Sequence, residues 1–145
     1  MSNTQDAMNL LFPAQRQQVL AALLLQPGHS LHLRELARLT GSHAGTLGRE
    51  LGKLAQAGLL LRSNQGNQAR YSANVQHPLF PELAAMFRKT HGVVPALRTA
   101  LEPLAGQIAL AFVYGSLASG TATQHSDVDV LLVGSVDFVA VVQAL

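Results

Sequence analysis

The sequence contains neither cysteine nor tryptophan, and only 12% of its residues are charged. Without cysteine the chain can form no disulfide and no thiolate metal site, which fits a reducing compartment. No run of about 18 apolar residues occurs, so we expect no transmembrane helix. The first residues lack the basic start and the long apolar block of a secretory signal, so we expect a cytoplasmic protein.

Charge is scarce and unevenly distributed. Typical soluble domains carry about 25% charged residues, whereas here 48% of the residues are hydrophobic. We therefore expect exposed apolar area and self-association, most simply as a homodimer. Residues 1–77 carry a net charge of +4 and residues 78–145 a net charge of −2. This asymmetry favours two parts with different partners, and the basic part suits a nucleic acid.

The first half of the chain reads as helices followed by a β-hairpin. Apolar residues at helical spacing predict amphipathic helices over about 13–26, 33–40 and 43–57, each ended by a glycine or a Pro-Gly pair. Ser42 is the predicted N-cap of the third helix. Residues 59–73 then alternate as two strands around a polar turn centred on glycine, which predicts a hairpin.

The stretch "LRELARLTGSHAGTLGRELGKLAQAGLLLRS", followed by "GNQARYSAN", resembles the winged helix-turn-helix domains of bacterial transcriptional regulators. We assign residues 12–76 to this domain. The resemblance implies that the third helix enters the major groove of double-stranded DNA and that the hairpin, the wing, contacts the backbone or the minor groove. The residues that we expect to contact DNA are Ser42, His43, Thr46, Arg49 and Lys53 on the helix, and Arg62, Asn64, Gln65, Asn67, Gln68 and Arg70 on the wing.

Alternatives stay open for several of these residues. Arg49 could be a surface arginine that pairs with Glu50 or Glu35, and His43 could be merely exposed to solvent. The third helix also contains three glycines, each of which costs roughly 1 kcal/mol relative to alanine in a helix interior. They either permit a close approach to DNA or to another helix, or they are tolerated defects. These glycines are Gly45, Gly48 and Gly52.

Prolines interrupt the pattern after the hairpin, and we assign residues 77–93 to a connector helix and 94–145 to a second domain. In this second domain the predicted elements are a helix over about 94–104, apolar strands over 107–114 and 127–134, and a final helix with Ser135 as candidate cap. Alternation of strand and helix argues for an α/β unit. The expected fold is therefore α/β, a two-part α+β chain.

The second domain contains a Gly-Ser pair, ten further residues, and then Asp-Val-Asp within an apolar run. Residues two apart on a strand share a face, so Asp127 and Asp129 should project together while the adjacent valines face the core. Two carboxylates at this spacing suit Mg²⁺, which takes phosphate oxygens as further ligands. Gly115 would let the backbone approach a phosphate, and Ser116 could offer a hydroxyl and an N–H at a helix start. The plain alternative is a polar strand end.

This constellation resembles the minimal nucleotidyltransferases of the DNA polymerase beta superfamily, and the resemblance covers about residues 94–145. It implies catalytic and metal-binding roles for Asp127 and Asp129, with Mg²⁺ as cofactor and a nucleoside triphosphate (NTP) as ligand. Two features depart from the family pattern. Asp137 is the only acid after Asp129 and is better placed to stabilise a helix N-terminus than to act as the third carboxylate. Ser119 or Gly120 stands where many minimal members have an arginine. The domain is therefore expected to be incomplete, because the chain is a fragment or because activity has been lost.

Together these features predict a DNA-binding transcriptional regulator with a nucleotidyltransferase-like domain that binds a magnesium nucleotide. The alternative is an active nucleotidyltransferase that moves a nucleoside monophosphate from an NTP to a protein, nucleic acid or small hydroxyl acceptor. A third possibility is an antitoxin-like or assembly role in which the second domain is a platform for a partner.

Overall fold

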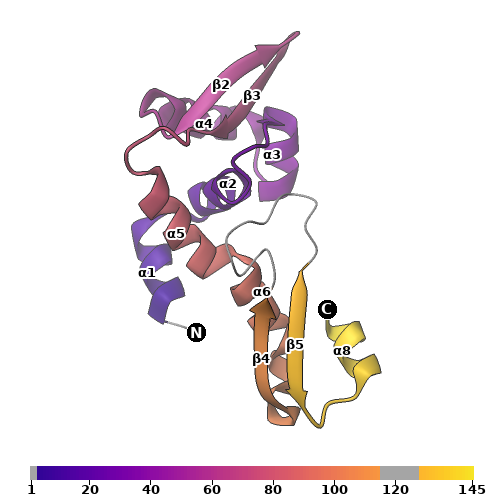
Figure 1. Ribbon diagram of the computed structural model, residues 1–145. Coiled ribbons are helices and arrows are strands. Elements are labelled where there is room, and N and C mark those ends of the chain that lie inside the picture. Colours follow the sequence, from indigo (N-terminus) through magenta and orange to yellow (C-terminus); the bar gives the residue numbers. More distant parts are fainter. Residues whose placement is uncertain (1–2, 115–127) are drawn as a thin grey trace. The chain divides into compact units, whose positions relative to one another are not determined.

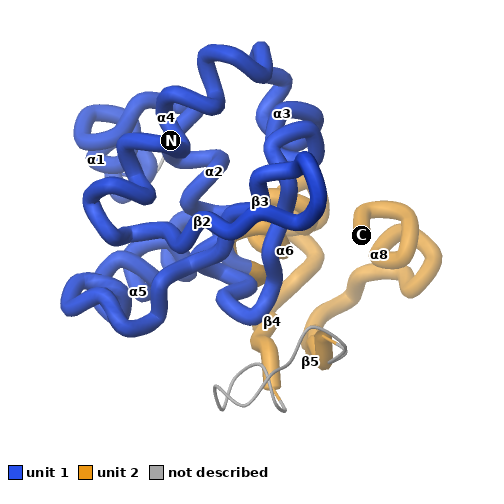
Figure 2. The backbone as a smooth tube through the Cα atoms, turned by 90° about the horizontal axis from the view of Figure 1, so that it is seen from above, with its two compact units in different colours: residues 1–92 blue, residues 93–145 orange. Residues whose placement is uncertain are grey.

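The computed structural model describes residues 3–114 and 128–145 of the chain. It divides into two compact units, Met1–Gly92 and Val93–Leu145 (Figure 2). Within the described residues, no helix has the length and apolar character needed to cross a membrane.

The first unit combines five helices with a small antiparallel sheet (Figure 1). Its three strands lie in the order β1-β3-β2. Its elements are α1 (Asn3–Leu11), α2 (Ala14–Leu24), β1 (Leu31–His32), α3 (Leu33–Thr40), α4 (Ala44–Gln56), β2 (Leu60–Gln65), β3 (Gln68–Ala73) and α5 (Phe80–His91). The sequence of helices followed by a hairpin is the one that the apolar periodicity predicts.

A single apolar core holds this unit together. Helix α2 turns leucine and valine side chains inward and helix α4 turns leucines inward, as their helical spacing requires. The unit extends beyond the segment 12–76, because α1 and α5 contribute Met8 and Phe87 to the same core. Phe87 is fully buried and its ring lies 5.7 Å from that of Phe12.

Helix α3 begins at Leu33 and is capped by Gly41, as its apolar spacing predicts. The two residues before it, Leu31 and His32, form β1 and pair with Tyr71 and Arg70 of β3, a strand that the sequence analysis did not predict. One local prediction for this unit was wrong. Ser42 is not the N-cap of α4. The cap is His43, whose Nδ1 accepts a hydrogen bond from the backbone N–H of Gly45 at 3.3 Å.

The hairpin has the form that its glycine allows. Strands β2 and β3 pair from Leu60↔Ala73 to Gln65↔Gln68, which leaves a two-residue turn. Gly66, the first residue of that turn, has a φ of 62°. Glycine at this position suits the tight turns whose twist matches that of the paired strands.

The second unit pairs two antiparallel strands with helices. Its elements are α6 (Val93–Leu101), the 3-10 helix η1 (Glu102–Gln107), β4 (Ile108–Tyr114), β5 (Asp129–Gly134) and α8 (Phe138–Ala144). Ser135 was wrongly predicted as the cap of the last helix. The N-cap is Asp137, whose carboxylate accepts a hydrogen bond from the N–H of Ala140 at 3.3 Å. The helix-terminal role expected for Asp137 is therefore confirmed.

Candidate functional site

Helix α4 presents a polar face to solvent opposite its buried leucines. Leu47, Leu51 and Leu54 are buried in the core. Thr46, Arg49 and Lys53 are exposed. Since residues three, four and seven apart share a helix face, the three leucines fix the helix in one orientation and leave its cationic side free.

The two carboxylates considered as partners for Arg49 are engaged elsewhere. Glu50 forms an ion pair with Arg16 of α2, and this hydrogen bond raises the pKa of Arg16. Glu35 accepts a hydrogen bond from the backbone N–H of His32 at 3.1 Å, which lowers the pKa of Glu35. Among residues 3–114 and 128–145, Arg49 has no ion pair. Its guanidinium is therefore available to a ligand.

The start of α4 also exposes a donor. Because Nδ1 of His43 accepts from Gly45, the proton of the neutral ring sits on Nε2. The side chain is exposed, so this N–H can reach a ligand at the helix N-terminus. Ser42 is half-buried, and its hydroxyl lies 3.5 Å from the carbonyl oxygen of Thr40. Ser42 is therefore a poorer candidate for ligand contact than His43.

The hairpin residues predicted to contact DNA fall into two groups. One group is exposed to solvent and comprises Arg62, Asn64, Gln65, Asn67 and Gln68. Arg70 differs, because its Nε donates to the hydroxyl of Ser30 at 3.0 Å and its Nη2 donates to the carbonyl of Ser30 at 2.9 Å. These bonds tie β3 to the loop before β1. Arg70 therefore anchors the hairpin, a role that sequence reasoning missed.

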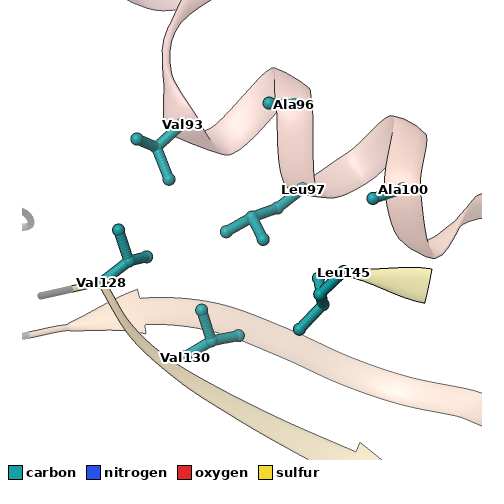
Figure 3. A pocket seen from close by; sticks show the side chains of 7 residues that line it. All are labelled: Val93, Ala96, Leu97, Ala100, Val128, Val130 and Leu145. Carbon is teal, nitrogen blue, oxygen red and sulfur yellow. The ribbon is translucent and has the colours of Figure 1, made fainter. Parts of the chain in front are cut away.

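In the second unit, Asp129 opens β5 and stands opposite Tyr114 of β4. It is half-buried. Val128 and Val130, on either side of it in sequence, turn toward α6 and line a small apolar cavity of about 340 Å³ (Figure 3). Alternation along the strand therefore puts the Asp129 side chain on the opposite face of the sheet. The two valines thus share the face predicted for them, but Val128 is exposed and Val130 is half-buried, so neither lies in a closed core.

The remaining lining of this cavity comes from α6 and from the end of α8. It comprises Val93, Ala96, Leu97, Ala100 and Leu145 (Figure 3). All seven lining residues are apolar, so the cavity offers no polar side chain to a nucleotide.

The other predicted residues of the phosphate and metal site lie outside the described residues. These are Gly115, Ser116 and Asp127, together with Ser119 and Gly120. Within the described part of the chain, no three histidine, aspartate or glutamate side chains gather as a metal-binding group. Asp129 is thus the one predicted ligand whose position the structure describes.

Comparison with known proteins bears on the second unit. Residues 94–143 match the family model described as nucleotidyltransferase domain. Comparisons with curated proteins and with solved structures gave no match. The matched segment spans β4, β5 and most of α8, and it includes Asp129. The C-terminal unit of this chain therefore contains a nucleotidyltransferase domain.

Proposed function

We propose that this protein is a DNA-binding transcriptional regulator whose nucleotidyltransferase domain binds a magnesium nucleotide. The observation that carries the first part is the free cationic face of α4, next to an exposed polar hairpin. The fold of the first unit supports reading it as a winged helix-turn-helix. Helices α3 and α4 are joined by three residues that begin with Gly41 at a φ of 61°, and the hairpin β2–β3 packs on α4.

The chemistry of this surface fits a polyanion. Arg49 and Lys53 on α4 and Arg62 on β2 supply three exposed cations. An unpaired arginine can bind a guanine edge or a phosphate in bidentate fashion, whereas a lysine acts as a point charge on phosphate. The Nε2–H of His43 adds a donor at the helix start. The exposed amides of the hairpin can reach sugars or base edges.

Duplex DNA binding tests this proposal directly. Fluorescence anisotropy with a labelled pool of random duplexes should show binding whose affinity falls steeply with salt, because phosphate contacts release counterions. Arg49→Ala and Lys53→Ala should each weaken binding about 5- to 150-fold, an estimate based on the 1–3 kcal/mol of a good contact.

Lys89→Ala is the matched control, since it removes one exposed positive charge from α5, which the proposal does not place on DNA. It should bind like the wild type. Absence of binding to any duplex at low salt, or equal losses in all three variants, would reject the proposal.

The second half of the proposal concerns Asp129 and Asp127. Nucleotidyltransferase domains commonly use Mg²⁺, and the two carboxylates supply the oxygen ligands that this ion prefers. Asp129 fits such a role because it projects away from the apolar cavity that Val128 and Val130 line. Gly115 and Ser116 are proposed to hold the phosphates. Calorimetry with each of the four NTPs and Mg²⁺ should detect binding that requires the metal. Asp129→Asn should weaken it at least 10-fold, while Asp137→Asn should not.

The family match also favours a second candidate, an active nucleotidyltransferase. In that reaction a hydroxyl oxygen of the acceptor would bond to the α-phosphorus of an NTP and pyrophosphate would leave. Asp127 and Asp129 would be the catalytic residues that hold the metal. Incubation with α-³²P-labelled NTPs and Mg²⁺ should then label an acceptor, and Asp127→Asn/Asp129→Asn should abolish the label. Equal label with both proteins would remove this candidate.

A further inference from the structure

The two faces of the β4–β5 sheet differ in what covers them. One face carries Val130 and turns toward α6 and the end of α8. The opposite face is apolar, and no other element among residues 3–114 and 128–145 covers it. Its side chains, which we call the open sheet face, are each 44–53% exposed, and they are Leu110, Phe112, Tyr114, Leu131 and Val133.

The strand register shows that these residues form one continuous surface. Phe112 lies directly across from Leu131, and Leu110 lies across from Val133. Directly opposed residues of an antiparallel pair point to the same face. The rings of Phe112 and Tyr114 lie 6.4 Å apart in an edge-to-face arrangement, which places both on that face. The Phe112–Leu131 pair is therefore the centre of the open sheet face.

An uncovered face of this kind is unfavourable in water. A sheet of only two strands is marginal by itself and normally gains its stability by packing an apolar face on another layer. Five half-exposed apolar side chains leave on the order of 400 Å² of apolar surface, at the level that marks an interaction site on a small protein.

Charge and area decide which occupant fits. Among the described residues of this face, Asp129 is the only charged one, and it lies at one end, opposite Tyr114. If two copies stack with their strands antiparallel, the two Asp129 carboxylates lie at opposite ends, roughly 15–20 Å apart for strands of this length. The centre of the contact then contains only apolar groups. Two such faces bury on the order of 800 Å², which corresponds to a weak interface.

We propose that a second copy of this chain packs its open sheet face against the first, forming a two-layered sandwich about a two-fold axis near Phe112. The interface is isologous, since the same surface serves on both copies. Because the area is small, the dimer forms and dissociates with concentration in the micromolar range or above. The dimer itself requires neither DNA nor a nucleotide. Because Asp129 lies on the open sheet face, a second copy on this face would compete with the magnesium nucleotide proposed at Asp129.

Sedimentation velocity of the full chain over a range of concentrations tests the proposal. The wild type should shift from a mass of 15.4 kDa toward twice that value as its concentration rises. Phe112→Glu and Leu131→Glu should each weaken association at least 10-fold, because both put a carboxylate at the centre of the contact. Val142→Glu places the same charge on an equally exposed position of α8 and should associate like the wild type.

A mixing experiment distinguishes contact between identical faces from other contacts. Phe112→Glu and Phe112→Lys should each be monomeric alone and should associate when mixed, since opposite charges then meet near the two-fold axis. Far-UV circular dichroism checks that each variant is folded. If Phe112→Glu fails to fold, Phe112→Thr, which retains strand propensity, takes its place in the concentration series.

Three results would overturn the proposal. The first is a wild type that stays monomeric to several hundred micromolar, which would mean that another segment or another protein covers the face. The second is equal association of the wild type with the Phe112 and Leu131 variants. The third is failure of the Glu and Lys variants to associate when mixed.

Discussion

Arg49 and Arg70 have the same side chain and were both expected to contact DNA, yet their surroundings separate them. The guanidinium of Arg70 is held by two hydrogen bonds to Ser30, 40 residues earlier in the chain. The guanidinium of Arg49 is exposed and has no ion pair within the described residues. Arg49 is thus a candidate for ligand binding, whereas replacement of Arg70 would first loosen the hairpin.

At the same scale, His91 makes stability depend on pH. Its ring packs on Phe87 with a centroid distance of 5.4 Å, and burial lowers the pKa of His91 below 6.5. The unfolded chain therefore binds the proton more readily. The free energy of unfolding should therefore fall as the pH drops through the region just below 6.5. His91→Phe keeps a ring at this position and should lose less stability between pH 7 and 5. Thermal unfolding curves that change equally with pH in both proteins would contradict this.

Gly134 is required by close contact between β4 and β5. A Cβ at this position would clash with the carbonyl oxygen of Gln107 and would lie 2.9 Å from the Cα of Ile108. Both are backbone atoms, so no side-chain rotation relieves the clash. Gly134→Ala should destabilise the second unit by about 1–3 kcal/mol in urea unfolding. Gly106→Ala is the control, because a Cβ there meets no atom within 4 Å. Equal stability of the two variants would show that the strands can shift apart without cost.

At the scale of the element, α8 depends on its cap. This helix has only seven residues, and the Asp137 carboxylate satisfies the N–H of Ala140 at its start. A short helix is marginal without such a partner. Asp137→Ala should lower the stability of the second unit by about 0.5–2 kcal/mol, whereas Ser135→Ala should leave it nearly unchanged. Chemical unfolding of both variants measures the difference. If only Ser135→Ala lowered the free energy of unfolding, Ser135 and not Asp137 would be the stabilising cap.

Helix α4 was predicted correctly, but the packing of the chain does not explain its three glycines. Its glycines are not needed for packing inside the chain. A Cβ at Gly52 would meet nothing within 4 Å, and one at Gly48 would meet Leu33 at an ordinary distance of 3.8 Å. The expectation that these glycines allow another helix of the same unit to approach finds no support in these contacts. Within the described residues, the structure provides no intramolecular reason for them.

At the scale of the whole molecule, the two units differ in how much apolar surface they bury. Nearly all of the fully buried side chains lie in Met1–Gly92, while the second unit buries only Leu101 and Val141 to a similar degree among its described residues. Since burial of apolar area is the main stabilising contribution, the second unit should unfold first. Urea unfolding monitored by hydrogen exchange should resolve two transitions, an earlier one for the second unit and a later one for the first.

Leu20→Ala separates these transitions. Leu20 is fully buried in the core of the first unit. The substitution should lower the free energy of the later transition by about 2–5 kcal/mol and leave the earlier one in place. If the open sheet face mediates dimerisation, the urea midpoint of the earlier transition should also rise with protein concentration. A single transition that Leu20→Ala shifts as a whole would mean that the two units unfold together.

Local chemistry in the sequence determined much of this protein. Apolar periodicity predicted α2, α4 and both strands of the hairpin. It also predicted that Val128 and Val130 share one face of their sheet, the face toward α6. These features depend on residues a few positions apart, so the sequence suffices to predict them. The Gly-Ser and Asp-Val-Asp pattern likewise indicated a nucleotidyltransferase domain, which the family match supports.

Tertiary structure alone decided which groups remain free. It pairs β1 with β3, joins α1 and α5 to the first core and engages Arg70 with Ser30. It also leaves one face of β4–β5 without a covering element from the described part of the chain. Each of these outcomes joins or separates residues far apart in the chain. The apolar run of β4 does not show which of its faces is covered, because burial depends on how many layers surround a strand, and the pattern of one strand does not contain that information.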